Sequence, residues 1–253
     1  MNPFKGTQVY ELSYVLSAQV PRYWALPPFL HVYLRRPGDV VNEQGVTVAS
    51  DLVVTAMHVG THVDAPYHVH SLYEEKGPPP PAGEELPVII GRGRLLDCRA
   101  LVSAGRVELG RADLEGLLRG QGASLRKGDV VLIATGWEQR AHDPEAYSGR
   151  DALVPGITLE AAQLLAEAGV QAVGADTPLV EASTCGLQVH RFLLRERGIL
   201  IMENLVLAAL ADARPSAFVF LALPLRIRGG TGSPIRAVAL VGEACQHLER
   251  ALL

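Results

Sequence analysis

Residues 57–70 hold the side chains best suited to chemistry in this 253-residue chain, because four of its eight histidines and one aspartate fall there. In an extended strand alternate side chains point to the same face, so residues of one parity share a face. The residues of this window that share a parity are His58, His62, Asp64, His68 and His70. Imidazoles beside a carboxylate form the donor set that a borderline divalent metal such as zinc prefers. The window therefore predicts a metal site.

An extended backbone fits residues 57–70 better than a helix does. His58 and His62 have the i, i+4 spacing of a helical zinc pair. However, Gly60 disfavours a helix and Pro66 would break one. Gly60 also leaves room for a close approach to the backbone. The alternative is an interior strand with hydrogen-bonded histidines, but packing alone gives no reason for so many polar side chains on one face.

A second informative region lies more than a hundred residues downstream. Residues 174–178 end an apolar run and contain Asp176, and His190 lies in a helix predicted after them. Residues 198–204 then place Glu203 at the end of another apolar run. A carboxylate in such a position needs a cation or a hydrogen bond, unless the chain leaves the sheet there for solvent. Together with the histidine window, Glu203 is a candidate metal ligand or general base.

The stretch from His58 to His68 resembles the H-x-G-T-H-x-D-x-P-x-H signature of the cyclase family. That family includes bacterial arylformamidases (kynurenine formamidases) and isatin hydrolases. The signature is specific because it places five functional side chains, a glycine and a proline in one short stretch. The likeness extends from about residue 11 to residue 241. Its further blocks are 173–178, His190, 199–205, 223–225 and 232–238.

The resemblance implies a mixed α/β fold of the swivelling β/β/α type and a homo-oligomer, either a dimer or a tetramer. It also implies one or two Zn²⁺ ions, with Mn²⁺ as an alternative, bound by His58, His62, Asp64, His190 and Glu203. The first ion would lie on the first three of these residues, and Asp64 would bridge to the second. His68 would be the catalytic acid/base, and Glu203 is the second candidate for that role.

The activity implied is metal-dependent hydrolysis of the amide bond of a small aromatic N-formyl amide such as N-formylkynurenine. A cyclic amide of the isatin type is the alternative substrate. The chemistry of the residues agrees, since a divalent ion activates water and a neutral imidazole can move the proton to the leaving nitrogen. The chain departs from the family at Tyr14, where a histidine is usual, and at Thr231, where an aspartate is usual.

Three other kinds of site are alternatives to this assignment. His62 and Asp64 with His190 match the facial triad of a non-haem iron oxygenase, but that assignment leaves the rest of the signature unused. A purely structural zinc site is typically closed and rich in cysteine, and no cysteine lies in the window. A thiol hydrolase would use Cys185 with His190, although Cys185 is better explained as a small packed residue.

Composition excludes several broad classes of protein. Hydrophobic residues make up 48% of the chain and charged residues 20%, which is typical of a globular domain. The net charge of -4 and the lack of a basic cluster argue against a nucleic-acid partner. No apolar run is long enough to predict a membrane span or a signal peptide. The widely spaced Cys98, Cys185 and Cys245 favour a reduced, cytoplasmic setting.

The elements that must position these residues are mostly strands, so we expect a mixed sheet or barrel-like core with peripheral helices in one domain, residues 1–253. The apolar runs that predict strands are 46–55, 94–98, 129–134, 170–175, 199–202, 218–223 and 235–241. Helices are predicted at 111–118, 158–169 and 187–196, with Thr158 as an N-cap. Residues 76–85 and 139–150 are predicted surface loops. Tyr23, Trp24 and Phe29 are candidates to line an aromatic pocket, with ordinary packing as the alternative.

Overall fold

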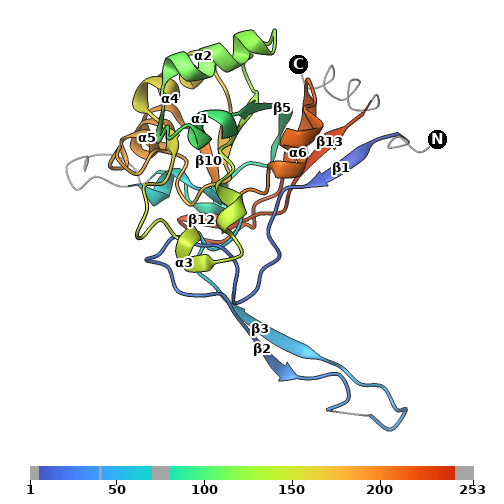
Figure 1. Ribbon diagram of the computed structural model, residues 1–253. Helices are drawn as coiled ribbons and strands as arrows, with labels where there is room; N and C mark the ends of the chain where they lie inside the picture. The colour runs from blue at the N-terminus through green and yellow to red at the C-terminus, as the bar shows by residue number, and fades with distance from the viewer. Residues whose placement is uncertain (1–5, 40–41, 70–79, 243–253) are drawn as a thin grey trace.

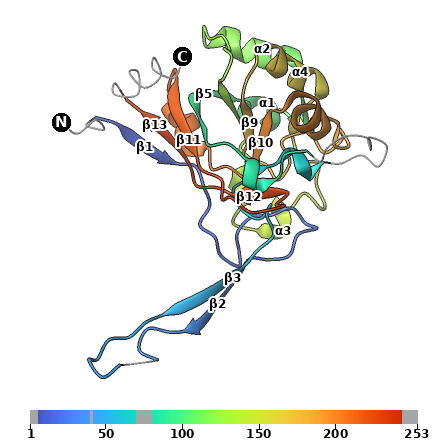
Figure 2. The ribbon, with the colours of Figure 1, turned by 180° about the vertical axis from the view of Figure 1, so that it is seen from behind.

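A mixed nine-stranded sheet is the central element of the computed structural model, which describes residues 6–39, 42–69 and 80–242. Parallel strands form the middle of the sheet, and antiparallel strands form both sides. The sheet curls strongly, with most helices packed outside it (Figures 1 and 2). The strand order is β1 (Gln8–Glu11), β13 (Ala237–Val241), β11 (Phe218–Ala222), β5 (Ile89–Asp97), β7 (Val130–Ala134), β9 (Ala172–Ala175), β10 (Leu200–Glu203), β4 (His62–Asp64) and β12 (Gly232–Pro234). The mixed α/β fold predicted from the sequence is confirmed.

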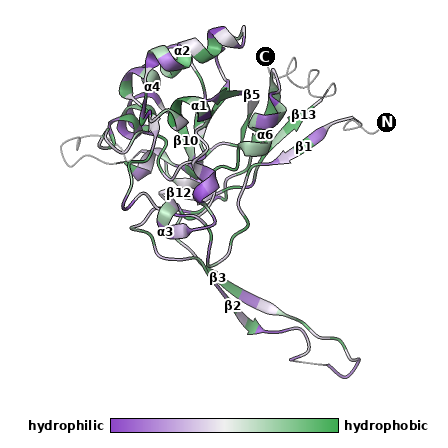
Figure 3. Cartoon of the chain, in the orientation of Figure 1, coloured by the Kyte–Doolittle hydropathy of each residue, from purple (hydrophilic) through white to green (hydrophobic). Residues whose placement is uncertain are grey.

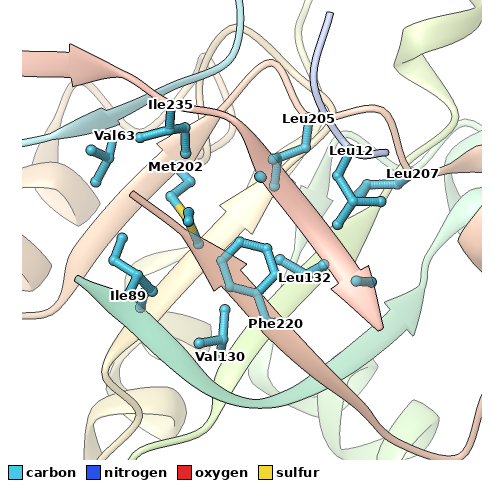
Figure 4. Close-up of a cluster of buried hydrophobic side chains, with 14 of the residues drawn as sticks. Leu12, Val63, Ile89, Val130, Leu132, Met202, Leu205, Leu207, Phe220 and Ile235 are labelled. Atoms are coloured by element: carbon cyan, nitrogen blue, oxygen red, sulfur yellow. The ribbon is translucent and has the colours of Figure 1, made fainter. Parts of the chain in front are cut away.

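The central strands are continuously apolar because the sheet has a hydrophobic core on each face. Along β7, Val130 and Leu132 point into one core, whereas Val131 and Ile133 point into the other. The first core lies inside the curled sheet (Figure 4), and Leu210 and Ala211 of a helix also belong to it. The second is covered by helices. Alternate residues of a strand bury on opposite sides, which explains the apolar runs that predicted β7, β9 and β10.

The helices cover one face of the sheet and its edges. Their bounds are α1 (Arg99–Ser103), α2 (Arg111–Gly120), α3 (Pro144–Tyr147), α4 (Leu159–Glu167), α5 (Gln188–His190) and α6 (Ala208–Ala213). Thr158 caps α4 by accepting a hydrogen bond from the amide of Ala161, as predicted. The helix predicted over 187–196 is a short α5 that continues as a π-helical segment, Arg191–Arg197. None of the helices in the described ranges is long and apolar enough to cross a membrane.

The histidine window is not one extended strand, so that prediction was only partly right. Within its described part, residues 57–69, His62–Asp64 alone forms a strand, β4, and Pro66–His68 forms a 3₁₀ turn. Gly60 has a φ of 67°, which a residue with a side chain rarely adopts. A Cβ there would lie 2.9 Å from Leu16 Cδ2, so the predicted close approach at this glycine is confirmed. His70 lies outside the described residues.

The polar segment 139–150, predicted as a surface insertion, is mostly exposed, and only Tyr147 and Ser148 in it are buried. The segment contains α3, and the Tyr147 side chain at the end of this helix is fully buried. Its ring packs with Trp137 and Val154 in a small separate core. Because the residues around Tyr147 in the sequence are polar, the sequence did not indicate that this side chain is buried. In the other predicted loop, 76–85, the described part ends in a 3₁₀ turn, Gly83–Glu85.

Two short sheets lie outside the main one. The strands β6 (Glu108–Leu109) and β8 (Gly156–Ile157) pair in parallel beside the helices. The strands β2 (Leu30–Arg35) and β3 (Ser50–Val54) form a hairpin that projects away from the body (Figures 1 and 2). The strand predicted over 46–55 is therefore present, but it lies in this exposed hairpin rather than in the core.

Candidate metal centre

The edge of the nine-stranded sheet brings the predicted ligands together. His62 and Asp64 alternate along β4 and so share one face, while Val63 between them enters the core (Figure 4). Antiparallel pairing sets Glu203 on β10 directly opposite His62. His58 reaches the same place from the turn before β4, and His190 comes from the end of α5. Segments more than a hundred residues apart thus meet at one point.

Two groups of three residues have ligand atoms within 4.8 Å of one another, and both include Asp64. The first group is His58, His62 and Asp64, and the second is Asp64, His190 and Glu203. In the first group, Asp64 Oδ1 lies 2.7 Å from His58 Nδ1 and 3.4 Å from His62 Nε2. In the second, His190 Nε2 lies 3.1 Å from Glu203 Oε1 and 3.7 Å from Asp64 Oδ2. All five predicted ligands therefore converge.

The outer nitrogen of each imidazole contacts a specific neighbour. His62 Nδ1 lies 2.9 Å from the carbonyl oxygen of Gly60, and His190 Nδ1 lies 3.0 Å from Glu181 Oε1. An Nδ1–H that donates to these oxygens makes Nε2 of both rings the atom directed at the cluster, where a bound cation would replace any proton on it. For His58 the outer contact is Nε2 to Thr231 Oγ1, at 2.9 Å. Each ring is thereby oriented before any ion binds.

Glu181 and Thr231 contact predicted ligands, and the sequence did not point to either contact. Glu181 is buried, and its second oxygen accepts a hydrogen bond from the amide of Val189. Glu181 directly follows the apolar residues 179–180. A carboxylate in such a position needs a cation or a hydrogen bond, as Glu203 does, so this pattern indicates Glu181 as well. Thr231 was noted only as a departure from the family pattern. No sequence signal pointed to its contact with His58.

The electrostatics of the cluster fit a divalent cation. Burial opposes the charge of Asp64, yet His58 and His62 hold the pKa of this carboxyl well below its usual range. Burial also disfavours a charged His62, but Asp64 and Glu203 outweigh it and raise the His62 pKa to about 10. The buried carboxylates thus hold protons on the imidazoles where a cation is absent. Metal binding would replace those protons.

Two buried atoms support this fit directly. His62 Nε2 and Asp64 Oδ2 have no hydrogen-bond partner among the described residues. A buried polar atom left without a partner is costly, and both atoms belong to the two groups described above. Gly232 leaves space here, since a Cβ at this position would lie 3.0 Å from His58 Cε1. The donor set of imidazole nitrogens and carboxylate oxygens suits a borderline divalent ion.

His68 lies beside the two groups and belongs to neither. The 3₁₀ turn Pro66–His68 places its ring 4.0 Å from that of His58 and 6.3 Å from that of His190, between centroids. Partial desolvation lowers the pKa of His68, an effect that the charge of Asp64 opposes and the nearby His58 and His190 strengthen. A neutral imidazole at this position can accept a proton near neutral pH.

A cavity of about 370 Å³ opens onto the cluster. His58, His62, His68 and His190 line one end together with Glu203. The other walls are largely apolar and are built by Tyr23, Leu26, Pro178, Leu179, Ala182 and Leu187. The cavity is large enough for a small aromatic molecule.

The three aromatic residues named from the sequence have different environments. Tyr23 lines the cavity, as predicted. Phe29 is buried against Val20 and Val59 and serves packing. Trp24 is exposed and does not line this cavity.

Asn204 fastens the strand that carries Glu203 to the turn that carries the histidines. Its backbone is left-handed, with a φ of 55°, which is strained for a residue with a side chain. Its side-chain amide donates to the Gly60 carbonyl, and its Oδ1 lies 2.8 Å from the Tyr147 hydroxyl. Thr61 Oγ1 also donates to the Asn204 carbonyl. These bonds hold the two ligand-bearing segments in register.

Comparisons with known proteins agree with this geometry. Residues 10–182 match the family model described as putative cyclase. The chain is 30% identical over 198 residues to a kynurenine formamidase of Bacillus thuringiensis (strain Al Hakam), covering 78% of this chain and 82% of that protein. It is 26% identical over 235 residues to a kynurenine formamidase of Bacillus cytotoxicus, covering 92% and 98%.

Solved structures show the same fold. A crystal structure described as a novel cyclase has a TM-score of 0.81 at 26% identity, covering 92% of this chain and 88% of that one. Isatin hydrolase A from Ralstonia solanacearum has a TM-score of 0.76 at 26% identity, covering 93% and 92%.

Proposed function

Because this chain belongs to the cyclase family, we propose that it is a metal-dependent hydrolase that cleaves the amide bond of a small aromatic N-formyl amide. The observation that carries this proposal is the pair of ligand groups that share Asp64, with two of their buried atoms lacking a partner. Its relatives named kynurenine formamidase support the substrate class. The bond cleaved is a carbon–nitrogen bond outside a peptide.

One or two divalent ions, Zn²⁺ or alternatively Mn²⁺, are the cofactor in this proposal. His58, His62 and Asp64 would hold the first ion, and Asp64 would reach a second ion held by His190 and Glu203. When bound, such an ion lowers the pKa of a water and polarises a carbonyl. Zinc accepts nitrogen and oxygen ligands of this kind, and so does manganese.

His68 is the proton carrier in this mechanism. As a neutral imidazole at the mouth of the ligand cluster, it takes a proton from the attacking water. It then gives that proton to the amide nitrogen, which leaves as an amine only once it is protonated. His58, against which the His68 ring packs, keeps the imidazole in place. Glu203 is the second candidate base, because its carboxylate faces the same cavity.

The apolar walls would position the aromatic part of the substrate. Tyr23, Leu26 and Leu187 line the same cavity as the ligand residues. A flat ring held there leaves its N-formyl group directed at His68 and at the cluster. A cyclic amide of the isatin type is the second candidate, supported by the similarity to isatin hydrolase A.

Turnover of N-formylkynurenine and of isatin by the zinc- and manganese-loaded protein tests the substrate class. The proposal predicts a clearly higher kcat/KM for N-formylkynurenine. A preference for isatin would select the second candidate. No turnover of either compound, or of other N-formyl aromatic amides, would refute the proposed activity.

The proposal also includes a setting for the enzyme. We take residues 1–253 as one catalytic domain, which the continuous sheet from β1 to β12 supports. We place the protein in the cytoplasm as a homo-oligomer acting on a small molecule. Cys98 and Cys185, which are both free, support a reducing compartment.

A further inference from the structure

Of the residues of α3, Tyr147 alone is buried, and α3 lacks the strong green of β5 in Figure 3. The Tyr147 ring packs with Trp137 and Val154 in the small separate core. Its hydroxyl, by contrast, lies 2.8 Å from Asn204 Oδ1 and 2.9 Å from the carbonyl oxygen of Asp176. The ring therefore belongs to the small core, whereas the hydroxyl belongs to the strand ends that meet at the metal centre.

A chain of hydrogen bonds leads from this hydroxyl to a predicted metal ligand. The Tyr147 hydroxyl donates to Asn204 Oδ1, and the side-chain amide of Asn204 donates to the Gly60 carbonyl at 2.9 Å. His62 Nδ1 lies 2.9 Å from the same carbonyl oxygen. A carbonyl oxygen has two lone pairs, so it can accept both bonds. The phenol and the imidazole are thus joined through one amide and one carbonyl group.

The Tyr147 hydroxyl favours one orientation of the Asn204 amide. Rotation of this side chain by half a turn would exchange its oxygen and its nitrogen. Asn204 Nδ2 lies 3.4 Å from His62 Nδ1, so the rotated state would place an oxygen there. That oxygen would compete with the Gly60 carbonyl for the His62 Nδ1–H. Burial raises the pKa of Tyr147 well above its usual value, so its hydroxyl remains a donor to Oδ1.

The orientation of the His62 ring matters because its other nitrogen faces the cluster. His62 Nε2 lies 3.4 Å from Asp64 Oδ1 and 3.5 Å from Glu203 Oε2. A zinc ion accepts an imidazole nitrogen only within a narrow range, at about 2.0–2.1 Å. A small rotation of the ring moves Nε2 out of that range. A bond that fixes Nδ1 therefore supports metal binding at Nε2.

We propose that Tyr147 is a positioning residue of the metal centre. Its hydroxyl holds His62, through Asn204 and the Gly60 carbonyl, in the orientation that binds a divalent cation. The inference rests on the proposed function, because it requires the centre to bind a metal. Tyr147 belongs to neither ligand group and does not line the cavity, so it acts on the cation only through this chain.

Tyr14 supplies an internal comparison for the hydroxyl. The Tyr14 ring contacts that of Tyr147 edge-on, with 6.4 Å between the centroids and 81° between the planes. The Tyr14 hydroxyl is also buried, but it has no hydrogen-bond partner among the described residues. Its removal changes a tyrosine beside Tyr147 without cutting the chain of hydrogen bonds. Tyr14→Phe is therefore the matched control for Tyr147→Phe.

Competition between the protein and a chromophoric chelator for Zn²⁺ tests this role without turnover. Tyr147→Phe keeps the buried ring and removes only the hydroxyl. Its Zn²⁺ affinity should fall about tenfold, the lower end of the effect of residues that orient a metal ligand. Tyr14→Phe should bind Zn²⁺ like the wild type. Val154→Ala weakens the same small core but keeps the hydroxyl, so it should lower thermal stability without changing Zn²⁺ affinity.

A double-mutant cycle with Asn204 tests the route of the effect. Asn204→Gly removes the amide, and glycine tolerates the left-handed backbone at this position. Zn²⁺ affinity should fall in this variant, and adding Tyr147→Phe should lower it no further, because both changes cut the same chain. The visible absorption of the Co²⁺-substituted protein, which depends on ligand geometry, should shift in Tyr147→Phe and stay unchanged in Tyr14→Phe.

Three results would overturn the inference alone. They are equal Zn²⁺ affinity in Tyr147→Phe and the wild type, an equal loss of affinity in Tyr147→Phe and Val154→Ala, and additive losses in the cycle with Asn204. Each of these leaves the metal centre itself intact. A wild type that binds no Zn²⁺ would instead overturn the proposed function and this inference together.

Discussion

At the scale of single residues, the metal centre is defined as much by the outer contacts of the imidazoles as by the ligand atoms. The five ligands could be predicted from the sequence because the signature places three of them within seven residues and Glu203 ends an apolar strand. Thr231 could not be predicted, because its role depends on β12 pairing beside β4. The sequence alone does not indicate that β12 pairs with β4.

Asp64 is the residue that both ligand groups share, so its replacement should affect every bound ion. Asp64→Asn removes a charged ligand while keeping the size of the side chain, and metal affinity should fall by more than about 100-fold. Metal content after dialysis and titration against a chromophoric chelator measure this. Asp176→Asn, at a buried aspartate outside both groups, should keep its metal. Full occupancy in Asp64→Asn would contradict the assignment.

His68 should matter for rate and not for metal binding. His68→Ala should lower kcat by about 10²–10⁴-fold, the usual contribution of general acid–base catalysis, with metal content unchanged. Steady-state kinetics and metal analysis on the same preparation measure both quantities. His142→Ala, at an exposed histidine, is the control. Loss of metal from His68→Ala would make His68 a ligand and leave Glu203 as the base.

Glu181 should act through His190, which its carboxylate contacts at 3.0 Å. Glu181→Gln keeps the shape but removes the charge that strengthens His190 as a ligand, so metal affinity should fall about 10–100-fold. Competition with a chelating dye measures the affinity directly, without turnover. Glu160→Gln, at an exposed glutamate, is the matched control. Equal affinity in the two variants would remove Glu181 from the metal centre.

At the scale of elements, the central strands and two of the three helices were predictable because burial on both faces and a capped amphipathic stripe are local patterns. The shape of the histidine window was not, because the left-handed Gly60 turns the chain between His58 and β4. That turn is stabilised by Asn204 and Tyr147, which are distant in sequence. The prediction that residues of one parity share a strand face is therefore right for His62 and Asp64, but it does not apply to His58 and His68, which lie outside β4.

Asp176 ties the end of β9 to the end of β7 and should make stability depend on pH. Its carboxylate accepts hydrogen bonds from Thr135 and from the amide of Gly136. Burial nevertheless raises the Asp176 pKa from 3.8 to about 6. Between these values the folded protein keeps a proton that the unfolded chain releases. Protonated Asp176 therefore contributes to the free energy of unfolding in full below about pH 4, and this stabilisation is lost as the pH rises through 6.

Urea unfolding of the wild type and of Asp176→Asn between pH 4 and 8 measures this contribution. The free energy of unfolding of the wild type should fall relative to that of the variant by up to ~3 kcal/mol across the window. The comparison uses the pH slope, so a constant loss of stability in the variant does not affect it. Parallel pH profiles would show that Asp176 is charged throughout.

At the scale of the whole molecule, the curled sheet brings segments from both halves of the chain to one cavity. The mixed α/β class could be predicted from the order of apolar runs, and the family signature implied the fold. The hairpin of β2 and β3 could not, because its alternating strands look like those of a half-buried sheet inside the body. Only the structure shows that the hairpin projects away from the body (Figure 1) and that the apolar side chains of both its strands are exposed.

The dependence of N-formylkynurenine turnover on bound metal tests the central claim most directly. Protein stripped by a chelator should lose turnover, and stepwise addition of Zn²⁺ or Mn²⁺ should restore it in proportion to the metal bound until the site is filled. Asp64→Asn, treated in the same way, should regain neither metal nor turnover. Full turnover by the stripped wild type, with no ion detected in the protein, would contradict a metal-dependent hydrolase built on these residues.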